Sequence, residues 1–142
     1  MIIIDATNKI LGRIASVAAK LALEGNEVII INSEKALISA NNKKNVEEFF
    51  KTKRDRGDPY HGPFYPRYPD QILKRVIRGM LPYKKDRGRK ALKRIKVYIG
   101  VPEDLNIDKE KLYEKIKGVK DLNKRATFVE LGEISKKLGA RW

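Results

Sequence analysis

The hydrophobic pattern at the start of the chain predicts a strand followed by a helix. A β-branched run at 2–4 fits a short buried strand, and Asn8 is placed to cap the helix after it. The expected helix has an apolar stripe, made of Leu11, Ile14, Ala15, Ala18, Leu21 and Ala22. Gly25 and Asn26 then end this helix, since both residues tolerate the backbone conformation that stops one.

The next apolar run predicts a second strand in the same sheet. Residues 28–31 are all β-branched, which is typical of a parallel strand covered on both faces. A right-handed crossover through the helix would make the two strands parallel neighbours in a βαβ unit. Residues 36–39 can add another strand after the turn at 32–33.

The middle of the chain alternates between helical patterns and a loop. A helix is expected to begin at Asn42 or Asn45 and to end near 54–57. Its apolar positions are Val46, Phe49 and Phe50. Residues 58–69 hold four of the six prolines, so they cannot form a regular helix or a central strand.

Helical spacing returns at 70–81, where one stripe is apolar. Its members are Ile72, Leu73, Val76, Ile77, Met80 and Leu81. Pro82 stops this helix, and a basic run at 84–96 leads into a strand-like segment at 97–99.

The last part of the chain is a moderately charged helical tail. One expected helix carries Leu112 and Ile116, and another carries Ile134 and Leu138. No repeat or low-complexity linker divides the chain, and 142 residues is a usual length for one domain. Residues 1–142 are therefore expected to form a single domain.

Charge changes this picture, because it is both high and unevenly placed. Charged residues make up 35% of the chain, against about a quarter in ordinary proteins, and the net charge is +14. Residues 1–42 carry four basic and four acidic side chains, residues 43–98 carry eighteen and six, and residues 99–142 carry ten and eight. Twelve of the fourteen net charges therefore lie in 43–98, which indicates a polyanionic partner for that segment.

Other features exclude some classes of function. The chain has no cysteine, which rules out disulfides, thiolate metal sites and cysteine nucleophiles. Its first residues lack the basic region of a signal peptide, and no apolar run approaches the ~18 residues that span a bilayer. We expect a cytoplasmic protein with no membrane partner.

The basic run at 84–96 is the clearest candidate for phosphate binding. Eight of its thirteen residues are basic, and Gly88 would let backbone approach a ligand closely. The candidate contacts are Lys84, Lys85, Arg87, Arg89, Lys90, Lys93 and Arg94. The alternative is a solvated, self-repelling surface, and the position of the run within the +12 segment favours nucleic acid.

The proline-rich loop is a second candidate, because it interleaves aromatic rings with arginines. Such side chains can stack on unpaired RNA bases, although they can equally fold a loop onto its own core. The candidates in and beside the loop are Lys53, Arg54, Arg56, Tyr60, His61, Arg67 and Tyr68. His61 is the only histidine, and alone it cannot build a metal site.

No enzyme motif emerges from the remaining residues. The turn after the first strand lacks the glycines of a phosphate loop or a dinucleotide fold, since only Gly12 is present. We expect Gly12 to permit close packing and Arg13 to face solvent or phosphate. The carboxylates Glu47-Glu48 and Asp55 with Asp58 are too ordinary in spacing to indicate a two-metal nuclease. We therefore expect no catalytic residues, no metal, no cofactor and no small-molecule substrate.

Several segments together resemble the ribosomal protein L13 family of the large subunit, in its archaeal and eukaryotic branch. The landmarks are Asp5-Ala6-Thr7, Leu11-Gly12-Arg13-Ile14-Ala15-Ser16, Ile31-Asn32-Ser33-Glu34-Lys35, Arg78-Gly79-Met80-Leu81-Pro82, Arg87-Gly88 and Lys96-Val97-Tyr98. Gly62-Pro63-Phe64 matches the archaeal and eukaryotic form of the family, and the absence of a long C-terminal extension points to an archaeal protein. The resemblance covers residues 1–102 well and the rest loosely.

The resemblance implies both a fold and a function. The fold would be a three-layer α/β/α arrangement with a four-stranded, largely parallel sheet. The function would be binding of large-subunit ribosomal RNA beside neighbouring ribosomal proteins, with an early role in assembly. Arg78 would then end its helix at the RNA surface.

Two other hypotheses compete with a structural, RNA-binding ribosomal protein. An RNA-processing or nucleotide-dependent enzyme would share the βαβ start and could use the available carboxylates, but it would turn over RNA in the presence of Mg²⁺. A general DNA-compacting protein would share the charge, but it would bind duplex DNA and ribosomal RNA equally well.

Overall fold

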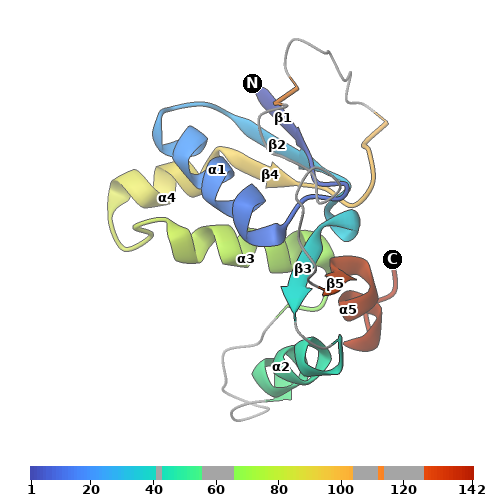
Figure 1. Ribbon diagram of the computed structural model, residues 1–142. Helices are drawn as coiled ribbons and strands as arrows, with labels where there is room; N and C mark the ends of the chain where they lie inside the picture. Colours follow the sequence, from blue (N-terminus) through green and yellow to red (C-terminus); the bar gives the residue numbers. More distant parts are fainter. Residues whose placement is uncertain (41–42, 56–65, 104–111, 114–126) are drawn as a thin grey trace.

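A computed structural model describes residues 1–40, 43–55, 66–103, 112–113 and 127–142 of the chain. The elements along the chain are β1 (Ile2–Asp5), α1 (Leu11–Leu23), β2 (Val28–Ile31), the 3₁₀ turn η1 (Ser33–Lys35), β3 (Leu37–Ala40), α2 (Lys43–Asp55), α3 (Pro69–Met80), α4 (Asp86–Lys93), β4 (Ile95–Val97), β5 (Thr127–Glu130) and α5 (Leu131–Lys137) (Figure 1). The elements expected at 2–4, 28–31, 42–57 and 70–81 are all present.

A parallel sheet with the order β1-β2-β4 organises the first two thirds of the chain. Ile2 pairs with Val28 and Ile4 with Ile30, which confirms the predicted parallel βαβ unit. Strand β4 adds to the free edge of β2, with Val28 opposite Ile95. This strand begins two residues earlier than the segment 97–99 expected from the sequence.

One face of this sheet packs against helices α1, α3 and α4. Since side chains alternate along a strand, the register places Ile4, Val28, Ile30 and Ile95 on one face, and all four are fully buried. The helices contribute Leu11, Ile14, Ala15, Ala18, Ala22, Ile72, Leu73, Ile77 and Ala91 to the same core. The stripe predicted for α1 is confirmed, while Met80 of the stripe predicted for α3 is 46% exposed.

A smaller sheet pairs β3 with β5 in antiparallel orientation. The strand expected at 36–39 therefore exists, one residue later, but it does not join the parallel sheet. Helices α2 and α5 pack beside this pair, and Lys137 of α5 forms an ion pair with Glu47 of α2. The described residues thus form an α/β fold with a three-stranded parallel sheet and a separate two-stranded antiparallel sheet.

Three local expectations are wrong for identifiable reasons. Asn8 does not cap α1, because it takes the left-handed conformation (φ 60°) in the turn before the helix and Ile10 is the N-cap residue. Gly12 does not mediate close packing: it is exposed, and a Cβ there would meet no described atom within 4 Å. Leu112 is not helical, since it bridges to Ile3 in parallel, while Ile116 lies outside the described residues.

Candidate nucleic-acid interface

The basic run folds into a helix, α4, that the sequence pattern did not indicate. Asp86 lies in its first turn and Lys90 and Lys93 in its last, an arrangement that suits the helix dipole. Gly88 and Ala91 are buried and Leu92 packs partly buried against the core, while the other five positions carry charge. Helical spacing of Gly88, Ala91 and Leu92 is the signal that would have identified this helix.

Most of the predicted phosphate contacts are exposed on α4 and the turn before it. The exposed cations are Lys84, Lys85, Arg87, Arg89, Lys90 and Lys93. They lie within ten residues of one another on a folded scaffold, so their positive potential is concentrated on one part of the surface.

Gly88 allows a close approach, but the approaching group belongs to the protein. A Cβ at this position would lie 2.0 Å from the carbonyl oxygen of Pro82 and 2.8 Å from the amide nitrogen of Tyr83. Glycine thus lets α4 pack directly on the turn that follows α3. The expectation that Gly88 opens the backbone to a ligand is therefore wrong.

Two arginines of the run are held by backbone carbonyls. The Nε and Nη2 atoms of Arg89 donate to the carbonyl oxygens of Tyr83 (3.2 Å) and Lys84 (3.0 Å). Arg94 is half-buried, and its Nη1 donates to the carbonyl oxygen of Ala22 (2.8 Å) at the end of α1. Arg94 thus joins α4 to α1, and its contact with RNA stays a prediction.

The segment Arg78 to Pro82 closes α3 beside this surface. Leu81 is buried and extended, because the helix cannot continue into Pro82. Arg78 is exposed in the last turn, and its guanidinium carbon lies 5.3 Å from the ring centroid of Tyr83, a cation–π contact. An exposed arginine therefore stands next to the cations of α4.

Arg67 and Tyr68 are exposed at the other end of α3. This helix has 12 residues, so its two ends are separated by about 18 Å. Figure 1 shows α4 and α5 on opposite sides of the molecule, and Arg67 belongs to the α5 side, since its carbonyl oxygen accepts a hydrogen bond from Ser135 of α5. The predicted RNA-binding residues therefore do not form one patch.

The other predicted contacts are described only in part. Arg13 is exposed in the first turn of α1. Lys53 and Arg54 belong to α2, but their side chains are not among those described. Arg56, Tyr60 and His61 lie outside the described residues, so their binding of RNA stays a prediction.

Polar residues at the carboxyl edge of the parallel sheet hold loops together. Asp5 Oδ1 accepts hydrogen bonds from the backbone N–H of Thr7 (3.0 Å), its hydroxyl (2.7 Å) and Asn32 Nδ2 (3.1 Å). Burial opposes ionisation of Asp5, but these hydrogen bonds and the charge of Lys9 outweigh it and lower its pKa. Several of the sequence landmarks thus serve the fold.

The described residues show no arrangement that indicates metal-dependent chemistry. Nowhere in the described ranges do three His, Cys, Asp or Glu side chains gather as metal ligands would. The same ranges contain no helix with the length and apolar character needed to cross a membrane.

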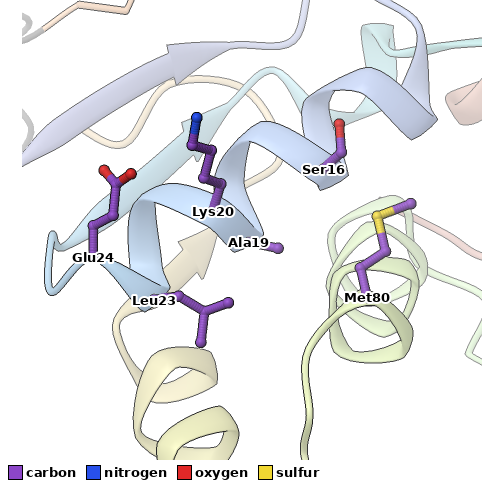
Figure 2. A pocket seen from close by; sticks show the side chains of 6 residues that line it. All are labelled: Ser16, Ala19, Lys20, Leu23, Glu24 and Met80. Carbon is purple, nitrogen blue, oxygen red and sulfur yellow. The ribbon is translucent and has the colours of Figure 1, made fainter.

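An open groove lies between α1 and the end of α3 (Figure 2). Ala19, Leu23 and Met80 supply apolar surface, while Lys20 and Glu24 carry the charges of its lining. Leu23 is 36% exposed and Met80 46%, so Met80 lines this groove and is not part of the core as the helical pattern suggested.

Comparison with known proteins decides what this scaffold is. The family model for ribosomal protein L13 matches residues 1–104. The chain belongs to the ribosomal protein L13 family. Membership confirms the prediction that the chain is not an enzyme, because this family is a structural component of the ribosome.

Relatives extend the likeness beyond the part matched by the L13 family model. The chain is 47% identical to the large ribosomal subunit protein uL13 of Methanopyrus kandleri, over 96% of this chain and 86% of the relative. It is also 47% identical to the protein of the same name from Methanosarcina barkeri, over the full length of both. The Archaeoglobus fulgidus protein is 43% identical over 98% of this chain and 88% of its own. The C-terminal third, which resembled the family only loosely by its motifs, is therefore part of the same relationship.

Proposed function

We propose that the chain is a structural component of the large ribosomal subunit that binds large-subunit ribosomal RNA. The observation that carries this proposal is the exposed cationic surface of α4, the preceding turn and Arg78, held on a folded scaffold in a chain of net charge +14. The names of the relatives support the ribosomal setting. The site of action would be the ribosome in the cytoplasm.

An early role in assembly agrees with the way this surface is built. Contacts within the protein hold α4 in place, including Gly88 against Pro82 and Arg94 on the end of α1. A surface whose backbone is ordered beforehand loses less conformational entropy when RNA binds, so more of the binding energy remains to order the RNA.

We also infer that the parallel sheet has a fourth strand and that a neighbouring protein binds the groove between α1 and α3. The parallel bridge of Leu112 to Ile3 supports a fourth strand at the β1 edge, and burial of Ile3 and Ile31 on the second face supports a three-layer arrangement. The apolar groove at Leu23 and Met80 is suited to a neighbouring large-subunit protein (Figure 2).

Salt dependence of binding tests the assignment of α4. Alanine at Lys85, Arg87 and Lys90 removes three exposed cations, and each lost phosphate contact should reduce the slope of log K against log salt by about one unit. The matched control is Lys96→Ala, an exposed cation of the same run that lies on β4. Equal slopes for the wild type and the triple variant would refute the role of α4.

Competition separates RNA binding from general DNA compaction. A ribosomal RNA-binding protein should retain its RNA when an equal concentration of duplex DNA is added. Comparable affinity for both would favour the DNA-compacting alternative, because contacts with phosphate alone do not distinguish the two.

A further inference from the structure

A second group of cations lies at α5, on the side of the molecule opposite α4 (Figure 1). We call Arg67, Lys136, Arg141 and Trp142 the C-terminal cluster; all four side chains are exposed. Residues 131–142 carry three basic side chains and one acidic, Glu133, so their net charge is +2. Arg67 joins them from a distant part of the chain and adds a further charge.

Hydrogen bonds fix the two parts of this cluster to each other. The indole Nε1 of Trp142 donates to the hydroxyl oxygen of Ser135 at 3.1 Å. That hydroxyl, fully buried, donates to the carbonyl oxygen of Arg67 at 2.6 Å. The backbone that carries Arg67 is therefore anchored on α5, and the cluster is a built surface.

Close packing positions the charged groups around the C-terminal tryptophan. A Cβ at Gly132 would lie 3.1 Å from Cζ2 of Trp142, so glycine allows the indole to rest against α5. The ammonium of Lys136 lies 4.8 Å from the centroid of the same ring. The guanidinium of Arg67 approaches Gly139, with Nη1 3.5 Å from the place of a Cβ.

Stabilisation of the helix end explains only part of this arrangement. Cations in a last turn favour a helix through its dipole, and Lys136 and Lys137 both lie in the last turn of α5. Lys137 turns to α2 and pairs with Glu47, whereas Lys136 lies over Trp142. The dipole does not account for Arg67, which comes from outside the helix.

We propose that Arg67, Lys136 and Arg141 bind the phosphate backbone of a second RNA segment, separate from the one bound at α4. Trp142 is a positioning residue that holds Lys136 and the end of the chain against α5. The inference rests on the proposed function, because the same partner is involved. With the two surfaces at opposite ends of α3, the protein would connect two RNA segments that lie about 18 Å or more apart.

The test uses the full chain and a transcript of archaeal large-subunit ribosomal RNA. In the double variant Lys136→Ala/Arg141→Ala, the slope of log K against log salt should become less steep by about two units. Lys137→Ala is the control, because it removes one positive charge from the same helix turn, and that charge is paired with Glu47. The control should change the slope by well under one unit.

Footprinting of the transcript separates this proposal from the proposed function. The wild type should protect two RNA segments, of which the Lys136→Ala/Arg141→Ala variant loses one and a Lys85→Ala/Arg87→Ala/Lys90→Ala variant loses the other. If only the α4 variant weakens binding, and the α5 variant behaves like Lys137→Ala, the second contact is refuted while the proposed function stands. If neither variant weakens binding, the proposed function fails as well.

Two further measurements keep the result interpretable. Melting temperatures should agree among the variants, and Lys136→Gln/Arg141→Gln should reproduce the alanine result if lost charge is its cause. Crosslinking in assembled subunits should join the cluster to RNA. Crosslinks to a neighbouring protein alone would overturn the proposal.

Discussion

Gly88→Ala should destabilise the protein, although alanine is the better helix former. The new Cβ would lie 2.0 Å from the Pro82 carbonyl oxygen, and ordinary contact begins near 3.4 Å, so helix and turn must separate by about 1.4 Å. Both partners are backbone, so no side chain can rotate away. The separation would also strain the hydrogen bonds from Arg89 to the carbonyl oxygens of Tyr83 and Lys84.

The magnitude follows from these opposing effects. Overpacking costs about 1–3 kcal/mol, and weakening two hydrogen bonds costs about 1 kcal/mol each. Replacing glycine by alanine within a helix stabilises the helix by about 1 kcal/mol, which opposes these losses. The expected net loss is about 2–4 kcal/mol, which corresponds to a fall in Tm of roughly 7–13 °C for a domain of this size.

Thermal unfolding followed by circular dichroism measures this effect. Gly79→Ala in α3 is the matched control, because a Cβ there meets no described atom within 4 Å. The control should keep or slightly raise Tm through its helix propensity. A Gly88→Ala protein that melts at or above the wild-type temperature would show that α4 does not pack on the turn at Pro82.

Three more predictions concern the contacts around the sheet and the groove. Arg94→Ala should lower the free energy of unfolding by about 1–2 kcal/mol in urea titrations, because it removes the hydrogen bond to the carbonyl oxygen of Ala22. The control Lys93→Ala, at an exposed neighbour, should leave it unchanged. Equal effects of the two substitutions would show that Arg94 does not join α4 to α1. Asp5 has a lowered pKa when folded, so its charge stabilises the fold above the unfolded value of about 3.9 and loses this effect as the pH falls through the folded pKa. The stability difference between wild type and Asp5→Asn should therefore shrink in urea titrations below about pH 4, and a constant difference would exclude this origin. Leu23→Gln, which adds no charge, should leave RNA affinity unchanged but reduce incorporation into reconstituted subunits, whereas normal incorporation would exclude the groove as a protein contact.

The sequence predicted the elements whose stabilising contacts have a local signature. The helix α1 and the strands β1 and β2 were found because their apolar patterns match the period of each structure. Strand β5 was missed because its partner β3 lies about 90 residues earlier in the chain, and such a pairing has no local signature. Helix α4 was missed because charge dominates its composition and hides the short apolar face at Gly88 and Ala91.

The candidate site was likewise predicted from the sequence only in part. Net charge located the basic segment, since composition is visible without any structure. The engagement of Arg94 with α1 and of Gly88 with Pro82 depends on which backbone atoms the fold brings near, and the sequence contains no sign of either. The cations of α5 were not predicted as a site, because residues 131–142 have a net charge of only +2. The fold brings Arg67 beside them from a distant part of the chain.

The contacts beneath α4 explain how so many like charges can occupy one short helix. As an isolated segment, residues 84–96 would extend, because eight cations repel one another and only Asp86 opposes them. In the protein, burial of Ala91, the close fit of Gly88 and the bond from Arg94 hold the helix in spite of that repulsion. RNA phosphates bound there, as proposed, would relieve this repulsion, so RNA that binds the folded form would also stabilise the fold. If α4 binds RNA as proposed, the contacts that keep it folded in the free protein would therefore also set how much electrostatic energy is available for RNA binding.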